Sequence, residues 1–497
     1  MTYKPIESYG VIGDMHSVAL VGNDGSIDWC CLPHFDSPSI FAAILDARKG
    51  GYFRICVEQN DGRTRQMYMP DTNVLMTRFL SSDGIAEVVD FMPVLTEAGG
   101  LTRQRGHQLI RTVRSVRRCA RFHLECVPAF DYGRQQHEVV IEPWGARFES
   151  PGQSFILLSP VPLEHFGSGV KANFELPAGK TLTFAIRHQE GQINRAVLQE
   201  SLDSEALLNE TVRFWRGWMS HCRYKGRWRE MVNRSALVLK LLTFQPTGAI
   251  VAAATASLPE ELGGERNWDY RYTWVRDAAF SVYALMRLGY TAEAGAFTRF
   301  MQDRAKEPET TNGPLNVMYG IDGRHELPEE ALSHFEGYRG SRPVRIGNAA
   351  ARHLQLDIYG ELMDSLYLHD KYGTPMSWDM WKDVERMLDW VTDNWQEPDQ
   401  SIWEVRGGRQ HFTYSKLQCW VALDRGLRLA QKRSFPLSGN HWRESRDRIY
   451  REMMSRAWNQ RLQSFVQYYE ADAVDASALM LPLMRFLSPT DPRMLST

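Results

Sequence analysis

The first part of the chain consists of short apolar runs separated by turn residues, a pattern that predicts β-strands. In "VALVGNDGSIDWCCLP" two apolar runs flank Asn23, Asp24 and Gly25, residues that accept the positive φ of a tight hairpin. Strand-length runs recur in "GIAEVVDFMPV", "HQLIRTVRSV", "RFHLECVPAF", "SFILLSP" and "TLTFAIRH", at the spacing of an antiparallel sandwich. We therefore predict an N-terminal antiparallel β-sandwich domain over residues 1–200.

The period of the pattern changes near Asp203. From there on, segments such as "RWREMVNRSALVLKLLTF" place apolar residues three and four positions apart, which is typical of amphipathic helices. We predict a linker helix region at 201–227 and a helical domain at 228–497. Further helices are expected at about residues 276–289, 291–306, 347–371, 377–395, 413–432, 440–458 and 475–487.

Long loops separate these helices, notably at residues 251–275, 307–346 and 396–412. Loops of that length inside a compact domain are usually functional. Helices alternating with long loops occur in solenoids, in bundles and in closed rings of helical hairpins. The lack of a fixed short repeat argues against a solenoid, and a ring would gather the loops at one end, where they can form a pocket.

Composition and charge narrow the classes of function. The chain has 497 residues, 43% of them hydrophobic, and a formal net charge of -2, so neither nucleic acid nor an anionic membrane is an expected partner. Its seven cysteines include no CxxC pair and no HExxH motif occurs; we expect reduced thiols, no metal and no cofactor. Because the N-terminus has no signal-peptide pattern and no apolar run is long enough to span a bilayer, we expect a soluble cytoplasmic protein.

Candidate chemistry gathers first in the loop "GGERNWDYRYTWVRDAAF". Tyr270, Trp274, Arg276 and Asp277 combine aromatic rings with a guanidinium and a carboxylate, and such groups recognise the apolar faces and hydroxyls of sugars. The structural alternative is that Asp277 caps the following helix while Arg276 forms a buried ion pair.

Two further loops carry candidate residues. The loop "HFEGYRGSRPVRIGNAA" contains Arg342 between two other arginines, which either bind a ligand, phosphate included, or tie the loop to the helix after it. In "SIWEVRGG" Trp403 precedes Glu404. A carboxyl group desolvated by an indole holds its proton near neutral pH and can act as a general acid; the alternative is a surface glutamate paired with Arg406.

Taken together and in this order, "NWDYRYTWVRDAAFSVYAL", "GSRPVRIGNAA" and "SIWEVRGGRQHFTYSKLQCWVALDRG" resemble glycoside hydrolase family 15, which includes glucoamylases, glucodextranases and bacterial trehalases. The segment "YGVIGDMHSVALVGNDGSIDWCCLPHFDSPSIFAAILD" resembles the β-sandwich that precedes the helical domain in bacterial and archaeal members. The resemblance thus covers nearly the whole chain.

The resemblance implies an (α/α)6 toroid with a pocket for one non-reducing terminal glucose. It also implies that Arg276 and Asp277, in the TW-x-RD segment with Trp274, hold the glucose hydroxyls, and that Glu404 protonates the leaving oxygen. The expected function is an inverting, exo-acting α-glucoside hydrolase, trehalase-like first and glucoamylase-like second. Trp403, Tyr270 and Arg342 are further candidate substrate contacts.

The sequence departs from the family pattern near its C-terminus. The family's general base is a glutamate in a late motif close to "SEE" and then "DP", which does not follow "DASALMLPLMRF" before Thr497. The periodicity also predicts only about eight or nine barrel helices, fewer than a toroid needs. We therefore expect a C-terminally incomplete toroid in which hydrolysis is lost or reduced. The alternative functions are a non-catalytic sugar-binding protein or inactive fragment lacking the base, and a phosphorylase using the loop arginines. An incomplete toroid could also form a homo-oligomer that covers its open apolar faces.

Overall fold

The computed structural model describes residues 3–58, 62–82, 84–94, 107–189, 204–308, 313–405, 407–437 and 440–497. Its contacts divide the chain into two compact units. The first comprises residues 1–246, 253–271 and 330–346, and the second comprises 247–252, 272–329 and 347–497. The domain boundaries that we predicted from the sequence, after residue 200 and before residue 228, stay predictions.

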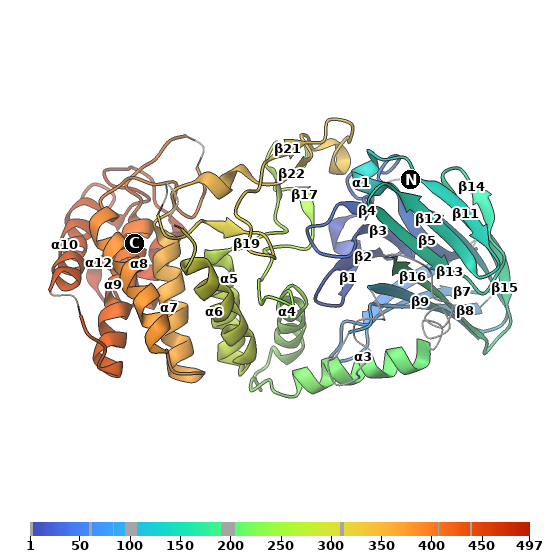
Figure 1. The fold of residues 1–497 in the computed structure, drawn as a ribbon, viewed down its shortest axis with the longest axis horizontal. Coiled ribbons are helices and arrows are strands. Elements are labelled where there is room, and N and C mark those ends of the chain that lie inside the picture. The colour runs from blue at the N-terminus through green and yellow to red at the C-terminus, as the bar shows by residue number, and fades with distance from the viewer. Residues whose placement is uncertain are drawn as a thin grey trace. The chain divides into compact units, whose positions relative to one another are not determined.

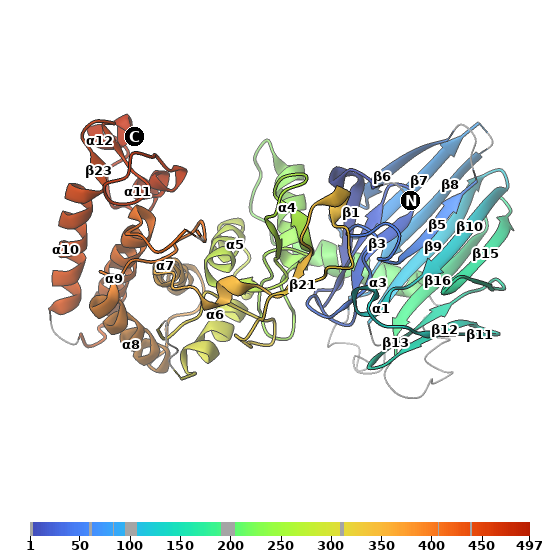
Figure 2. The same ribbon diagram turned by 90° about the horizontal axis from the view of Figure 1, so that it is seen from above.

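Within the described residues of the first unit, sixteen strands form two antiparallel sheets of eight strands each, as the sequence predicted. Figures 1 and 2 show the two sheets as the layers of a sandwich. One sheet has the order β1 (Tyr9–Gly13), β2 (Val18–Gly22), β3 (Ser26–Cys31), β5 (Tyr52–Val57), β10 (Ala120–Val127), β15 (Gly169–Leu176) and β14 (Glu164–Phe166), with β4 (Ser39–Phe41) paired to β3. The other has the order β11 (Glu138–Glu142), β12 (Gly145–Ser150), β13 (Gln153–Leu158), β16 (Thr181–His188), β9 (Gln108–Arg117), β8 (Gly84–Phe91), β7 (Leu75–Ser81) and β6 (Arg63–Tyr68).

The predicted hairpin between β2 and β3 is confirmed. Gly25 has φ 81° and its amide donates to the carbonyl of Gly22 at 2.9 Å. A Cβ at this position would lie 2.1 Å from the carbonyl oxygen of Ile55, so a residue without a side chain is required here.

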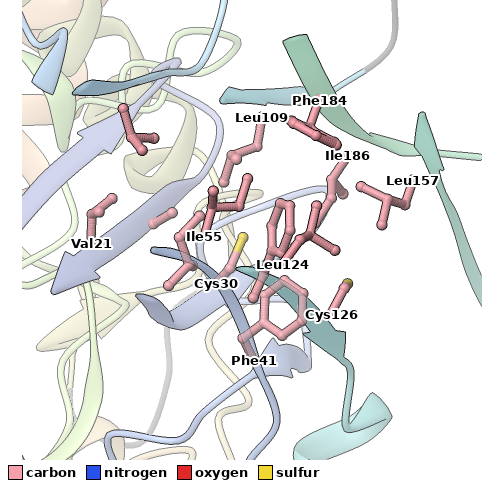
Figure 3. Close-up of a cluster of buried hydrophobic side chains, with 14 of the residues drawn as sticks. Val21, Cys30, Phe41, Ile55, Leu109, Leu124, Cys126, Leu157, Phe184 and Ile186 are labelled. Atoms are coloured by element: carbon pink, nitrogen blue, oxygen red, sulfur yellow. The ribbon is translucent and has the colours of Figure 1, made fainter. Parts of the chain in front are cut away.

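The core of the sandwich lies between the inner faces of the two sheets. Figure 3 shows Val21, Ile55 and Leu124 from one sheet packed with Leu157 and Phe184 from the other. Burying each such side chain contributes roughly 1.5–3 kcal/mol. The alternation of inward and outward residues along each strand is therefore what sets the register of the sheets.

Two helices of the first unit, α3 (Ser204–Met219) and α4 (Arg229–Leu241), follow the sandwich strands in the sequence. Helix α4 is tied to the chain just before β7, because Asn73 donates to the carbonyl of Leu237 at 3.3 Å and Arg234 donates to the carbonyl of Thr72 at 2.9 Å. All seven cysteines are free thiols.

The second unit is built from helical hairpins. Helix α7 packs against both α5 and α9, while α6 packs against α8 and α8 against α10. Figures 1 and 2 show these helices side by side in an inner and an outer layer. The described helices of this unit longer than two turns are α5 (Val275–Leu288), α6 (Ala292–Ala305), α7 (Asp357–Tyr372), α8 (Trp378–Asn394), α9 (Thr413–Arg433) and α10 (His441–Arg456).

The helix predicted at 347–371 begins ten residues later than expected. Asn348 caps a short 3-10 turn, and the chain then runs extended from His353. The amide of Leu354 donates to the side chain of Gln400 at 3.0 Å and that of Leu356 to Asp399 at 2.9 Å. Because loop side chains accept these two amide hydrogens, the helix starts only at Asp357.

The helix predicted at 475–487 is also shorter than expected. The described residues form a 3-10 turn over Ala476–Leu479 and a single turn, α11, over Met480–Leu483. Pro482 lies inside this turn and has no amide hydrogen to donate back along the helix, and Arg485 just beyond it has φ 64°, so the apolar period at this point does not produce a long helix. In the described parts of the chain, every helix is too short or too polar to cross a membrane.

Candidate active site

Glu404 lies in a closed loop between α8 and α9. Backbone hydrogen bonds of 3.0 and 2.9 Å between Asp399 and Gln410 join the two ends of this loop. Glu404 itself has φ 50°, a left-handed conformation that costs a residue with a side chain about 1–2 kcal/mol. Strained backbone of this kind is concentrated at functional sites. The Glu404 side chain is 23% exposed.

Trp274 provides the indole that contacts Glu404. It lies at the end of β19 (Thr273–Trp274), which pairs with β20 (Met318–Tyr319), and it is 2% exposed. Its Nε1–H donates to Oε1 of Glu404 at 2.7 Å. The neighbouring Trp403, which the sequence suggested as the indole beside Glu404, donates its Nε1–H to Asp475 at 2.7 Å. Trp403 is 47% exposed, and its predicted contact with substrate stays a prediction.

Arg276 connects the TW-x-RD segment with the start of α7 and with the loop of Glu404 through polar contacts. One guanidinium nitrogen lies 2.9 Å from Oε1 of Gln355 and 3.4 Å from Oδ2 of Asp357. The other lies 3.2 Å from Asp277 and 3.6 Å from Oε1 of Glu404. Burial opposes the charge, but the carboxylates of Asp277, Asp357 and Glu404 together raise the pKa of Arg276. It is therefore a permanent cation at the centre of the site.

Arg276 and Asp277 of the TW-x-RD segment lie in the first turn of α5. The buried ion pair predicted for Arg276 is present. Asp277 is not the N-cap residue of α5, which is Trp274, but it lies in the first turn of that helix, where its carboxylate accepts from its own backbone amide. The Asp277 carboxylate is 47% exposed, beside the guanidinium. The partner considered for Glu404 in the other interpretation, Arg406, lies outside the described residues.

Sequence reasoning missed Gln355, whose amide bridges the site. Its Oε1 accepts from Arg276, and its Nε2–H donates to Oε1 of Glu404 at 3.1 Å. Gln355 lies in the extended segment before α7, which the predicted helix had covered. The signal available in the sequence was the run "QLDIYGEL", which places polar residues among apolar ones at the start of a helix.

A layer of buried carboxyl groups lies on α7 and the adjoining loop. Asp357 and Glu361 are one helical turn apart, and both are buried. Burial, reinforced by the charge of Asp357, raises the pKa of Glu361 to about 8 although Tyr414 donates to it. Burial and Asp357 likewise raise the pKa of Asp399 to about 7. Near neutral pH, Glu361 is therefore largely protonated.

Replacing Glu361 with glutamine is expected to reduce the pH dependence of stability. Since the folded state favours the protonated acid, its contribution is fully present below the ordinary pKa of 4.5. It is lost as the pH rises toward about 8, by roughly 1.4 kcal/mol per pH unit. Glu361→Gln has no proton to lose, and its Oε1 can still accept from Tyr414 and Gln418.

Urea unfolding of both proteins between pH 5 and 8 measures this difference. The exposed Glu444→Gln on α10 is the control and should follow the unmodified chain. Parallel stability profiles for Glu361→Gln and the unmodified chain would contradict the assignment.

Replacing Trp274 with phenylalanine is expected to lower kcat about 10- to 150-fold with little change in KM. The substitution keeps the ring and removes one hydrogen bond to a carboxylate, worth about 1.5–3 kcal/mol. The measurement is the steady-state release of glucose.

Trp442→Phe is the matched control, because its indole Nε1–H also donates to a carboxylate, Asp389, at 2.6 Å, but between the outer helices α8 and α10. An equal loss of kcat in both variants would show that the effect is one of stability.

Tyr270 and Arg342 belong to the first compact unit, and their substrate contacts stay predictions. The Tyr270 hydroxyl donates to Glu260 at 3.3 Å, and Arg342 is exposed before a cis Pro343. The arginines on either side have structural contacts. Arg339 stacks on Tyr338, and Arg345 stacks on Trp268 and donates to the carbonyl of Glu265 at 2.7 Å.

Comparison with known proteins identifies the family of both parts of the chain. The sequence profile of the glycosyl hydrolases family 15 matches residues 226–497, and that of the trehalase-like N-terminal domain matches residues 2–171. The chain belongs to glycosyl hydrolase family 15. The fold class predicted from the sequence, a β-sandwich followed by the helical domain of this family, is thereby confirmed.

Members of family 15 with assigned functions match over the full chain. The trehalases of Mycobacterium tuberculosis and Thermoplasma volcanium are each 36% identical over 100% of this chain, which covers 75% and 78% of their lengths. A bacterial glucoamylase solved in complex with acarbose superposes with a TM-score of 0.71 at 12% identity, covering 100% of this chain and 78% of that protein. This last similarity concerns the fold. The chain is thus a family 15 glycosyl hydrolase of the trehalase type.

Proposed function

We propose that the site around Glu404 hydrolyses α,α-trehalose to glucose, with maltooligosaccharides as the second class of substrate. The observation that carries the proposal is the convergence of Trp274, Gln355 and Arg276 on one oxygen of Glu404. Residues of the TW-x-RD segment and of the segment before α7 therefore contact the same carboxylate, that of Glu404. Trehalose ranks first because the full-length similarity at 36% identity is to trehalases.

In this proposal Glu404 is the general acid. Its Oε1 accepts hydrogen bonds from the indole and the amide, so the proton to be donated resides on Oε2. As this proton moves to the glycosidic oxygen, negative charge develops on the carboxylate. The indole, the amide and the guanidinium then stabilise that charge in position, which lowers the barrier of the step.

Arg276 and Asp277 hold the terminal glucose in the proposed complex. The guanidinium and the half-exposed carboxylate of Asp277 lie 3.2 Å apart, so they offer a donor and an acceptor side by side. Neighbouring hydroxyls of a pyranose can bind both. Trp403, Tyr270 and Arg342 remain candidates for further contacts.

An inverting reaction also needs a second carboxylate that activates water, at roughly 6.5 to 9.5 Å from the acid. We assign no residue to that role. The proposal therefore covers two steps of the mechanism: sugar binding by Arg276 and Asp277, and proton donation by Glu404.

The test is a product assay on the purified 497-residue chain with trehalose, maltose and maltotriose. The expected result is release of one β-glucose, from the carbon that water attacks, and one α-glucose, from the leaving group, per trehalose, followed by proton NMR at early times. Saturable binding of trehalose by calorimetry without any glucose supports the sugar-binding alternative. Phosphate-dependent formation of glucose 1-phosphate would instead identify a phosphorylase.

We also propose that the protein acts in the cytoplasm. Seven free thiols are consistent with a reducing cytoplasm. A homo-oligomer stays a prediction, which size-exclusion chromatography with light scattering can measure.

A further inference from the structure

The β-sandwich contains a cluster of metal-ligating side chains that the reaction does not use. Asp14 and His16 lie in the turn between β1 and β2, and His107 lies immediately before β9 of the other sheet. One ligand atom from each of the three lies within 4.8 Å of those of the other two. Because the contributing segments are far apart in the sequence, no local spacing could have predicted the cluster.

The turn holds Asp14 in one orientation. Its Oδ1 accepts from the amides of His16 at 2.9 Å and Ser17 at 2.8 Å. The amide of Asp14 donates in turn to the carbonyl of Ser17 at 3.2 Å. The second carboxylate oxygen, Oδ2, is thereby aimed at Nδ1 of His107, 3.3 Å away.

His107 is fixed by a backbone hydrogen bond within the sheet that contains β9 and β16. Its carbonyl accepts from the amide of His188 in β16 at 2.9 Å. Its ring packs 5.0 Å from that of His16 and 5.6 Å from that of His34, and Phe244 contacts both of these rings. Aromatic side chains therefore surround the three ligand groups and partly exclude water from them.

Charge is the strongest argument for a cation. Asp14 is 1% exposed, and a buried carboxylate without a compensating charge is costly. Among the described residues its one ion-pair partner within 4 Å is His107, which is charged only when protonated. A divalent ion would compensate the carboxylate while the imidazoles stay neutral.

We propose that Asp14, His16 and His107 bind one divalent first-row transition metal ion, such as zinc, which links the β1–β2 turn to β9. Two imidazoles and a carboxylate suit this class of ion. Ligand atoms at about 2.1 Å from a tetrahedral zinc lie about 3.4 Å apart. Because no two of the ligand atoms are more than 4.8 Å apart, changes of about 1.4 Å or less in these separations bring the three groups to that spacing, and water completes the coordination.

Zinc binding to the tag-free full chain tests the proposal. After treatment with a chelator, the chain is expected to take up one zinc ion by mass spectrometry and to unfold about 5 °C higher with zinc at one hundred times the Kd. Asp14→Asn, His16→Gln and His107→Gln should each bind at least about 100-fold more weakly. His165→Gln, an exposed histidine on β14, is the matched control and should bind as the unmodified chain does.

X-ray absorption of the unmodified zinc-bound chain gives a readout that does not depend on the folding of a variant. Two imidazole nitrogens at about 2.0–2.1 Å are expected. A sulfur shell at about 2.3 Å, fewer than two imidazoles, or no zinc retained would overturn the proposal. Equal binding by the three variants and the control would overturn it as well.

Discussion

Glu404→Gln is expected to lower the release of glucose from trehalose about 1,000-fold while trehalose still binds. Glutamine keeps the shape of the side chain and an oxygen that accepts from Trp274 and Gln355. It has no proton to give to the glycosidic oxygen, and loss of a general acid costs about 100- to 10,000-fold in rate. The measurement is kcat for glucose release, with the Kd for trehalose from calorimetry.

Two comparisons make this result specific to the acid. Glu444→Gln, an exposed substitution on α10, should leave kcat unchanged. A substrate whose leaving group needs no protonation, such as a glucosyl fluoride, should recover most of the rate in Glu404→Gln. Unchanged turnover of trehalose by Glu404→Gln would end the assignment of Glu404 as the acid.

Arg276→Met is expected to have the largest effect on stability, and also to abolish sugar binding. Asp357 is fully buried and pairs with Arg276 at 3.4 Å, so removal of the guanidinium leaves a buried carboxylate without its counter-charge. Breaking such a pair costs about 3–5 kcal/mol. Urea unfolding followed by circular dichroism measures the loss.

The double variant Arg276→Met/Asp357→Asn separates the ion pair from the packing. It should recover part of the lost stability, because the buried charge is gone, but it should not recover sugar binding. Arg428→Met is the control, since Arg428 is 44% exposed and its i,i+4 partner Asp424 keeps a second guanidinium, that of Arg425, at 2.7 Å, so the loss should be less than about 1 kcal/mol. If Arg276→Met unfolds like the control, the site is not held together by this guanidinium.

The order of strands and helices could be predicted from the sequence because it depends on local period. The runs around β8, β9, β10 and β16 have the strand lengths that their alternation predicted, and α5, α6, α8, α9 and α10 lie within a few residues of their predicted bounds. The two misplaced helices depend on non-local or residue-specific effects. Side chains of the 399–410 loop delay the start of α7, and Pro482 shortens the segment after residue 475.

The candidate site was predicted only in part, because the sequence shows local patterns and not the contacts between distant residues. Trp274, Arg276, Asp277 and Glu404 stand out as aromatic and charged residues in long loops. Their partners do not, because Gln355, Asp357 and Glu361 lie in a run that reads as an ordinary amphipathic helix. The indole whose Nε1–H bonds Glu404 is that of Trp274, 130 residues earlier in the chain, and not that of the adjacent Trp403, which bonds Asp475.

The sequence by itself determined the class of the fold and the family, because periodicity and motif order are properties of the chain. It also identified the carboxylate proposed as the acid. Only the tertiary structure decided which indole contacts that carboxylate, which charges surround Arg276, and that Asp14, His16 and His107 meet. These are contacts between residues distant in sequence, whose geometry is set by the packing of whole elements and not by any local pattern.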